Sequence, residues 1–445
     1  MLKFYNTLSK SVEDFTPLNS KEIKMYICGP TVYSLDHLGH ARVGVFYDSV
    51  RRYFQYLGFR VKFVQNITDV GHLTEEEEPE DKIIKAAQKE GKSPLEIARY
   101  FEKKHFEAME KLNILKPDFS PRASENIDVM IEIIKTLIDK DFAYETKTGI
   151  YFDVKKIKDY GKLSGRMKVK DQFKGSRINL KEDKKDPQDF ALWVKAKPGH
   201  LLKWTSPWGE GYPGWHIECS AMIKKFLDFP IDIHGGGNDL IFPHHENERA
   251  QGIGFSDKEP VRYYLHLGQV KIAGKKMSKS LGNVVILEDL EKKYPTDWIR
   301  LALLLTNYSK PLDFSLERIK EADKIIARLS EAGNKAKEKN SGKIISKIKE
   351  AIEDNFNFAK AIAIWDEKRA EVSKKEFADL KQIFGLNLEE EKIPQEILEK
   401  ALERQAARQV GDFKKADKLR QEILSKNYVI EDSGDSFRIK RKDEV

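Results

Sequence analysis

The fold class is decided by residues 23–66, which read IKMYICGPTVYSLDHLGHARVGVFYDSVRRYFQYLGFRVKFVQN. The apolar stretch 23–28 has the length of a short strand and ends at a Gly-Pro pair, which interrupts regular structure. From Leu38 to Leu57 apolar residues recur every three or four positions, which predicts one buried face of a helix. Gly58 ends that pattern, and residues 60–66 predict a second strand. This order of elements predicts the start of a doubly wound α/β domain with a parallel sheet.

The composition is that of a globular protein. The chain has 445 residues, 34% of them charged, and at about 150 residues per domain its length suggests three domains. No stretch approaches the ~18 consecutive apolar residues of a membrane helix, and the first residues lack the apolar segment of a secretory signal. Two cysteines exclude a disulfide framework, so we expect a cytoplasmic protein with reduced thiols and no membrane partner. The net charge of +7 is weak support for a nucleic-acid partner, and it is not concentrated in the tail.

The rest of the chain alternates between helical and irregular patterns. Apolar spacing predicts helices at about 82–113 and 125–140, the second with Ser124 as N-cap, and a hairpin at 143–154. A strand at 231–233 runs into three glycines, 235–237. From about residue 287 to 385 the chain reads as nearly all helical, and residues 395–445 read as a last compact unit.

Two short motifs suit a phosphate ligand. His37-Leu38-Gly39-His40 stands where the first helix begins, and a helix N-terminus attracts anions. Lys276-Met277-Ser278-Lys279-Ser280 is a loop of lysines and hydroxyls flanked by glycines, which is able to wrap a polyphosphate. Taken alone, each motif is more often a solvated helix start or a solvated lysine loop.

A scattered set of four residues has zinc-ligand chemistry: Cys28, Cys219, His244 and Glu248. His244 and Glu248 are four apart, so they share one face if their segment is helical. The competing interpretation is two buried apolar cysteines beside a surface helix. Because the chain has no Cys-x-x-Cys pair, spacing alone favours that second interpretation.

The two phosphate motifs, in this order and about 240 residues apart, resemble the class I aminoacyl-tRNA synthetases. The more detailed resemblance is to the cysteinyl-tRNA synthetase family, and it runs from about residue 2 to the end. It is carried by residues 28–33, 66–69, 189–193, 206–209, 213–222, 234–237, 242–248 and 276–283.

This resemblance implies a fold and a division into domains. A Rossmann-type catalytic domain would occupy 1–114 and 206–260, split by a connective insertion at 115–205. A stem-contact region with the lysine loop would follow at 261–320, then an α-helical bundle at 321–390. A small α+β anticodon-binding domain would close the chain at 395–445.

The resemblance also implies an activity and its ligands. The enzyme would activate L-cysteine with ATP and Mg²⁺ and then transfer it to the 3′-terminal adenosine of tRNA(Cys), acting as a monomer. One Zn²⁺ per chain would be held by Cys28, Cys219, His244 and Glu248. A thiophilic ion would distinguish cysteine from serine, because the two amino acids differ only in a sulfur or an oxygen atom and zinc prefers the sulfur.

Further residues take expected roles from the same resemblance. The catalytic residues would be His37, His40, Lys276 and Lys279, and ATP would be bound by His37, Gly39, His40, His234, Gly235 and Lys279. Substrate would contact Cys28, Gly29, Thr31, Thr68, Trp215 and His234. Anticodon bases would be read by Arg408, Asp417 and Asp432.

Two alternatives remain at this point. A synthetase-related ligase that joins cysteine to an amino sugar would share the zinc and ATP sites, but it has no use for the tail beyond 395. A catalytically inactive RNA-binding paralogue would have lost one of the two motifs, whereas His37, His40 and Lys279 are all present.

Overall fold

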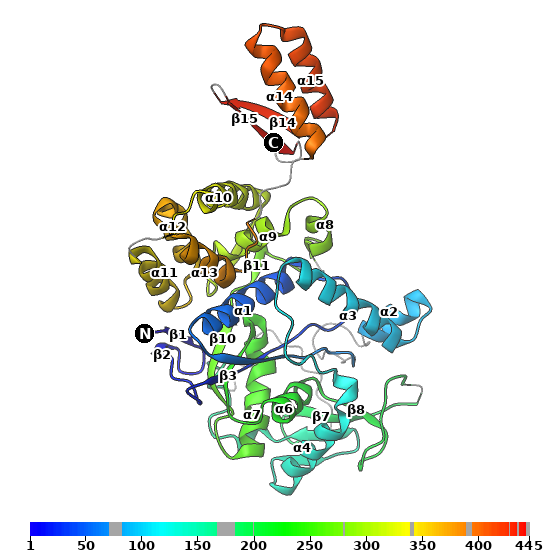
Figure 1. Cartoon of the computed structure of the whole chain (residues 1–445). Helices are drawn as coiled ribbons and strands as arrows, with labels where there is room; N and C mark the ends of the chain where they lie inside the picture. Colours follow the sequence, from blue (N-terminus) through cyan, green and yellow to red (C-terminus); the bar gives the residue numbers. More distant parts are fainter. Residues whose placement is uncertain are drawn as a thin grey trace.

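The computed structural model describes residues 1–70, 82–166, 183–198, 200–278, 281–338, 342–388, 394–426, 428–433 and 436–441 (Figure 1). At its centre is a parallel sheet in the order β4-β3-β9-β10, made of β3 (Glu22–Ile27), β4 (Arg60–Gln65), β9 (Ile231–Gly237) and β10 (Val261–Leu267). Helix α1 (Leu38–Tyr56) connects β3 to β4. The predicted strand–helix–strand unit and the doubly wound α/β class are therefore confirmed.

The sheet separates two apolar cores, because successive residues of a strand point to opposite faces. Met25 and Ile27 of β3 pack in the same core as α1, whereas Tyr26 between them belongs to the other core. That second core is completed by α4 (Ile127–Asp139), α6 (Trp215–Phe226) and α7 (Glu246–Ser256). Both faces of the sheet are thus covered, as a parallel sheet requires.

The chain between β4 and β9 adds helices and a second sheet. The helices are α2 (Lys82–Glu90), α3 (Pro94–Lys111), the short η1 (Ala123–Glu125) and η2 (Val154–Lys156), with α4 between the last two. The sheet is antiparallel, in the order β5-β6-β7-β8, from β5 (Ala143–Glu145), β6 (Gly149–Phe152), β7 (Phe190–Lys195) and β8 (Gly211–Pro213). Its fourth strand lies past residue 205, where the insertion was predicted to end. The hairpin expected at 143–154 is present as β5 and β6.

Two details of this region differ from the sequence prediction. The single helix expected at 82–113 is two helices, because Ser93 starts a new one with a capping box to Glu96. Ser124 is not the cap of α4; that position belongs to Asn126. The Ser124 hydroxyl instead donates to Asp69 at 2.6 Å.

The remaining elements follow in chain order. Near the central sheet lie β1 (Lys3–Asn6), β2 (Ser11–Asp14), η3 (Asn238–Leu240) and η4 (Ile241–His245). After β10 come β11 (Val270–Ile272), β12 (Lys275–Lys276), α8 (Leu287–Glu291), α9 (Thr296–Leu304) and β13 (Leu312–Phe314). The helical stretch consists of α10 (Leu316–Asn334), α11 (Lys343–Glu353), α12 (Phe358–Glu367), η6 (Arg369–Glu371) and α13 (Lys374–Phe384). Strand β13 interrupts the region that was predicted to be nearly all helical.

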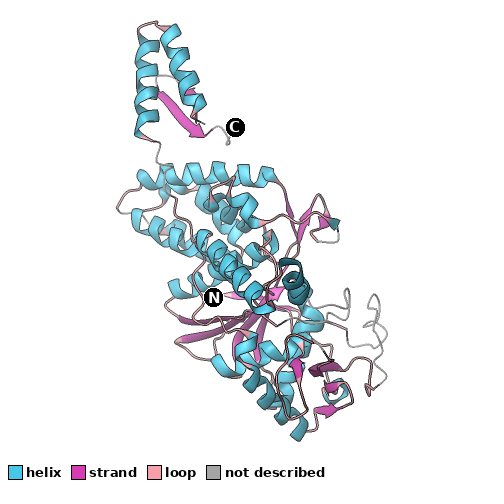
Figure 2. Ribbon diagram, turned by 90° about the vertical axis from the view of Figure 1, so that its right-hand side faces the viewer, coloured by secondary structure: helices cyan, strands magenta, loops and turns pink. Residues whose placement is uncertain are grey.

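The last part of the chain packs mainly on itself (Figure 2). It contains α14 (Gln395–Gln409), α15 (Phe413–Ser425), β14 (Tyr428–Ser433) and β15 (Ser436–Arg441). Ile397, Ala401 and Ile423 form a small core of their own with Tyr428 and Ile430. Within the described ranges, no helix is long and apolar enough to span a membrane.

A buried ion cluster joins α1, which packs on the central sheet, to the helical stretch. Asp48 on α1 is ion-paired with Arg300 of α9, and it accepts from Arg52 Nε at 2.7 Å. Arg300 is fully buried and also donates to the carbonyl oxygen of Phe384 at the end of α13, at 2.6 Å. Arg52 reaches the same helix by donating to the carbonyl oxygen of Gln382 at 3.2 Å. One carboxylate therefore neutralises two buried guanidinium groups from two elements.

We expect Asp48→Asn to lower the free energy of unfolding by about 3–5 kcal/mol, because it leaves two buried charges without their counterion. Urea unfolding of the variant and the parent would measure the difference. The matched control is Glu22→Gln, which breaks a 3.5 Å ion pair to Arg60, a residue 79% exposed, and should cost at most about 1 kcal/mol. Equal effects of the two substitutions would contradict the role given to Asp48.

Candidate active site and metal centre

The histidine motif forms the start of α1. His37 is the N-cap, and its Nδ1 accepts from the backbone N–H groups of Gly39 at 3.1 Å and His40 at 3.4 Å. The acceptor role leaves the ring proton of a neutral His37 on Nε2. The His40 ring stacks on that of His37, with centroids 3.9 Å apart. A Cβ on Gly39 would lie 2.9 Å from the His37 ring, so glycine keeps this cap compact.

The lysine loop meets the histidine motif. The backbone N–H of Leu38 donates to the carbonyl oxygen of Val285, and that of Leu287 donates to Asp36, at 3.0 and 2.9 Å. Asn283 closes the loop from inside, accepting from Ser278 N at 2.9 Å and donating to the Lys276 carbonyl oxygen at 3.1 Å. Lys279 and Ser280 lie outside the described residues. The segment that follows the lysine loop is thus bonded to the start of α1, and the end of the Met277 side chain lies beside Gly39.

A cavity of about 320 Å³ opens beside these motifs. That volume is in the range of small-ligand sites, roughly 300–1,000 Å³. The sequence-predicted residues that line it are Cys28, Gly29, Thr31, His37, Gly39, His40, Thr68, Trp215, Cys219, His244 and Lys276. It lies at the carboxyl ends of β3 and β9, where the strand order reverses, which is where open α/β sheets bind ligands.

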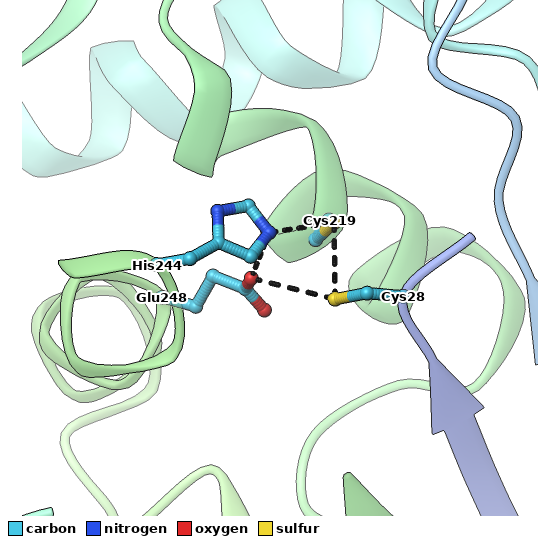
Figure 3. Close-up of side chains that lie close together, drawn as sticks. All are labelled: Cys28, Cys219, His244 and Glu248. Atoms are coloured by element: carbon cyan, nitrogen blue, oxygen red, sulfur yellow. Dashed lines mark hydrogen bonds and ion pairs between the residues drawn. The ribbon is translucent and has the colours of Figure 1, made fainter. Parts of the chain in front are cut away.

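The four predicted metal ligands converge at the edge of the cavity, where Cys28, Cys219 and His244 line the wall and Glu248 lies behind them (Figure 3). Cys28 follows β3, Cys219 lies on α6, His244 on η4 and Glu248 on α7. Cys28 Sγ lies 3.9 Å from Cys219 Sγ and 3.9 Å from Glu248 Oε1, and His244 Nε2 lies 3.6 Å from Cys219 Sγ. Ligands of one tetrahedral zinc stand about 3.3–3.8 Å apart, given bond lengths of about 2.0–2.3 Å. His244 Nε2 and Glu248 Oε1 are in direct ion-pair contact at 2.7 Å.

The charges in this cluster are set by burial and by the neighbours. Burial raises the pKa of the Cys28 thiol, as does its contact with Cys219. Burial opposes ionisation of Cys219 too, but contacts from Cys28 and His244 outweigh it and bring the pKa to about 7. Burial alone would lower the pKa of His244, whereas the charge of Glu248 and the Cys219 contact raise it to about 10. The donor set of two sulfurs, one imidazole and one carboxylate fits a zinc ion, which must displace protons from Cys28 and His244.

A second set of ligand atoms overlaps the first and contains Cys28, His234, His245 and Glu248. His234 was predicted to touch ATP and substrate. It is fully buried, with Nε2 2.6 Å from Glu248 Oε2 and Nδ1 3.0 Å from the carbonyl oxygen of Tyr26, and it is not among the cavity-lining residues. His245 approaches Cys28 Sγ at 3.2 Å and contacts His266 at 2.7 Å. His266 was not predicted from the sequence, because the pairing of β10 with β9 brings it here.

At two of the predicted glycines, neighbouring atoms leave no room for a side chain. A Cβ on Gly29 would lie 1.7 Å from the carbonyl oxygen of Asn66, and one on Gly235 would lie 2.1 Å from the hydroxyl of Tyr47. Gly235 lies in β9 and does not line the cavity.

Among the predicted pocket residues, Thr68 donates to Glu218 at 3.3 Å. Trp215 stacks on His244 with ring centroids 4.2 Å apart, which fixes the orientation of that ligand.

The three predicted anticodon residues lie in the last compact unit, away from the cavity. Asp432 accepts two hydrogen bonds from Arg404, at 2.7 and 2.9 Å, and lies 3.6 Å from Arg408. Arg408 and Asp417 lie on α14 and α15. Sequence analysis missed Phe413, which is 62% exposed at the start of α15. An exposed aromatic ring, on which a base is able to stack, is one feature of single-stranded nucleic-acid sites.

Comparisons with known proteins agree with this architecture. Residues 14–324 match the family model described as the tRNA synthetases class I (C) catalytic domain. The chain is 40% identical to the cysteine–tRNA ligase of Caldicellulosiruptor saccharolyticus, over 99% of this chain and 100% of the relative. It is 42% identical to that of Pyrococcus abyssi, over 99% of each. Among solved structures, the Mycobacterium tuberculosis methionyl-tRNA synthetase in complex with methionyl-adenylate shares the fold, with a TM-score of 0.58, 14% identity and 92% of each chain covered.

We expect the parent protein to hold about one zinc ion per chain and Cys219→Ser to lose most of it, because a hydroxyl replaces thiolate poorly. Elemental analysis after dialysis would measure the content. Zinc affinity should also fall as the pH is lowered, since protons compete for Cys28 and His244. The control is Ser220→Ala, which removes a neighbouring hydroxyl bonded to Gln251. A full equivalent of zinc in Cys219→Ser would contradict the assigned ligand set.

Proposed function

Since the chain belongs to the cysteine–tRNA ligase family of class I aminoacyl-tRNA synthetases, we propose that the cavity beside Cys28 is where its amino acid is activated. The enzyme joins cysteine to tRNA at the expense of ATP. In the first step L-cysteine and ATP give cysteinyl-adenylate and pyrophosphate. In the second the cysteine passes to the 3′-terminal adenosine of tRNA(Cys). The amino-sugar ligase and the inactive paralogue gain no support, because the relatives match the chain along nearly its whole length.

One observation carries the assignment of the site. The wall of a single cavity holds both the histidine motif and two cysteines with an imidazole, and Glu248 stands directly behind them. The motif suits the phosphates of ATP, and the sulfur-rich cluster suits the thiol of cysteine. The two substrates would therefore meet in one place, with the amino acid at the metal cluster and the nucleotide at the start of α1.

The metal cluster is proposed to select cysteine. A pocket that relies on shape separates close analogues only by about 10- to 200-fold. A zinc ion bound here would add a coordination position that prefers a soft sulfur ligand to a hydroxyl and lowers the pKa of the bound thiol. Trp215, stacked on His244, would close the side of this pocket.

Activation is an in-line attack of the cysteine carboxylate on the α-phosphorus of ATP, so no protein nucleophile is needed. The chain has to position the reactants and balance charge on the phosphates. His37, with its Nε2–H, would contact phosphate oxygens, as would His40, at the positive end of the α1 dipole. Lys276 and Lys279 of the lysine loop, together with Mg²⁺ carried by ATP, would stabilise the leaving pyrophosphate.

The last compact unit is proposed to read the anticodon. Arg408 and Asp417 carry hydrogen-bonding groups on neighbouring helices, and Asp432 is fixed by its double contact with Arg404. Phe413 offers an exposed ring on which a base would stack. We further propose that the enzyme acts as a monomer in the cytoplasm, where its tRNA is found.

We expect Cys219→Ser to reduce the preference for cysteine over serine more than it weakens the binding of ATP. The reason is that the substitution alters the sulfur-binding cluster and leaves the start of α1 in place. Pyrophosphate exchange with each amino acid, at several ATP concentrations, measures both quantities. Ser220→Ala is again the matched control. An unchanged cysteine-to-serine ratio in Cys219→Ser would remove the selecting role from this cluster.

We expect a chain truncated before Pro394 to retain pyrophosphate exchange and to charge tRNA at least about tenfold more slowly, because base contacts contribute about 1–3 kcal/mol each. The removed unit has its own small core, so the rest should stay folded. In the full chain, Arg408→Ala should slow charging in the same direction without affecting exchange. If the folded, truncated protein loses both activities equally, the division of labour is wrong.

A further inference from the structure

A buried carboxylate at the edge of the cavity joins two histidines from different parts of the chain. Asp36 precedes the cap of α1 and is 7% exposed. Its Oδ1 lies 2.7 Å from Nδ1 of His40, and its Oδ2 lies 2.7 Å from Nδ1 of His105, which belongs to α3. Both histidines line the cavity. The histidine motif accounts for His40, but neither Asp36 nor His105 belongs to it.

The contacts fix how each ring presents its nitrogens. An ionised carboxylate only accepts hydrogen bonds, so a ring nitrogen held against it carries its proton there. His105 therefore turns its Nδ1–H group toward Asp36. Nδ1 of His40 makes an ion-pair contact with the other carboxylate oxygen, without hydrogen-bond geometry, and Nε2 of each ring is left to other partners. His37 is held the opposite way, since its Nδ1 accepts from the backbone of Gly39 and His40.

The charge on Asp36 is secured by the same neighbours. Burial would raise the pKa of this carboxyl group, but the contacts with His105 and His40 hold it well below its usual range. From α8, Glu291 adds a further nearby carboxylate, whose pKa is raised by burial and which is paired with Lys111 at 3.0 Å. The carbonyl oxygen of Asp36 accepts from Leu287 N at 2.9 Å, which ties its backbone to the segment after the lysine loop.

We propose that Asp36 and His105 are positioning residues for the nucleotide site: Asp36 is the counterion of a doubly protonated His40 ring, whose Nε2–H would donate to a phosphate of ATP, and His105 anchors Asp36 to α3. The proposal rests on the role given above to His40. Asp36 touches no reacting atom and acts only through His40. Its removal should therefore slow activation and leave the binding of cysteine at the metal cluster unchanged.

A double-mutant cycle on pyrophosphate exchange tests this link. Asp36→Asn keeps the size of the side chain and removes its charge. It should lower kcat about 10- to 100-fold, the effect expected for loss of a charge-assisted contact, with the KM for cysteine unchanged. Asp36→Glu should recover part of the loss. The double variant Asp36→Asn/His40→Ala should be no slower than His40→Ala alone, because Asp36 has nothing to position once the ring is gone.

The control is Asp232→Asn, which alters another buried aspartate that accepts from Leu18 N and Lys24 N at the opposite end of the sheet. It should leave kcat unchanged. His105→Gln tests the same link from α3, and it should slow exchange without adding to the effect of Asp36→Asn. Melting temperatures of all variants separate loss of folded protein from loss of rate.

The outcomes distinguish the positioning role proposed for Asp36 from the role given to His40. If His40→Ala slows exchange while Asp36→Asn does not, the proposal is overturned and the role of His40 stands. If the effects of Asp36→Asn and His40→Ala multiply, Asp36 does not act through His40, and the proposal is again overturned. If His40→Ala itself leaves exchange unchanged, both claims fail. A large loss of kcat in Asp36→Asn, together with a double variant that is no slower than His40→Ala alone, supports the proposal.

Discussion

The parallel pairing of β3 with β9 is the constraint on which the whole site depends. It sets Ile27 opposite Gly235 and lets the backbone N–H of Cys28 donate to the Gly235 carbonyl oxygen at 3.2 Å. The carboxyl ends of two strands more than 200 residues apart are thereby placed side by side. The histidine motif and two of the four metal ligands follow these strands: α1 follows β3, and η4 and α7 follow β9, whereas Cys219 comes from α6, before β9. A register shift of this pair would separate Cys28 from His244 and Glu248.

Two further sets of contacts hold in place the helix and the loop that surround the cavity. The backbone of residues 285–287 bonds to the start of α1, so the lysine loop is held near the histidine motif. The Asp48 cluster bonds α1 to α9 and α13, so the helix that begins at the site is also held against the helical stretch. Helix α1 is thus restrained at its N-terminus by residues 285–287 and further along its length by the Asp48 cluster. Such restraint suits a reaction in which the protein mainly orients two substrates.

Features of the fold and site that depend on local sequence could be predicted, whereas features that depend on contacts between distant residues could not. The β3–α1–β4 unit was predictable, because its periodicity is local. The break between α2 and α3 was missed, although Ser93 and Glu96 form a recognisable capping box. For the metal cluster, spacing alone favoured two buried cysteines, and only the family resemblance singled out the four ligands that the structure gathers. Asp36 with His105, and His245 with His266, were beyond reach because each pair is brought together by tertiary packing.

The central claim is that the cluster of Cys28, Cys219, His244 and Glu248 is a metal site that recognises the substrate by its sulfur. X-ray absorption at the zinc edge of the full-length protein tests this claim most directly, because it counts sulfur neighbours. We expect two sulfur neighbours in the protein alone, three after cysteine is added, and two after serine is added. A sulfur count that does not change with cysteine would contradict it, and would leave the cluster as a structural site with no open position.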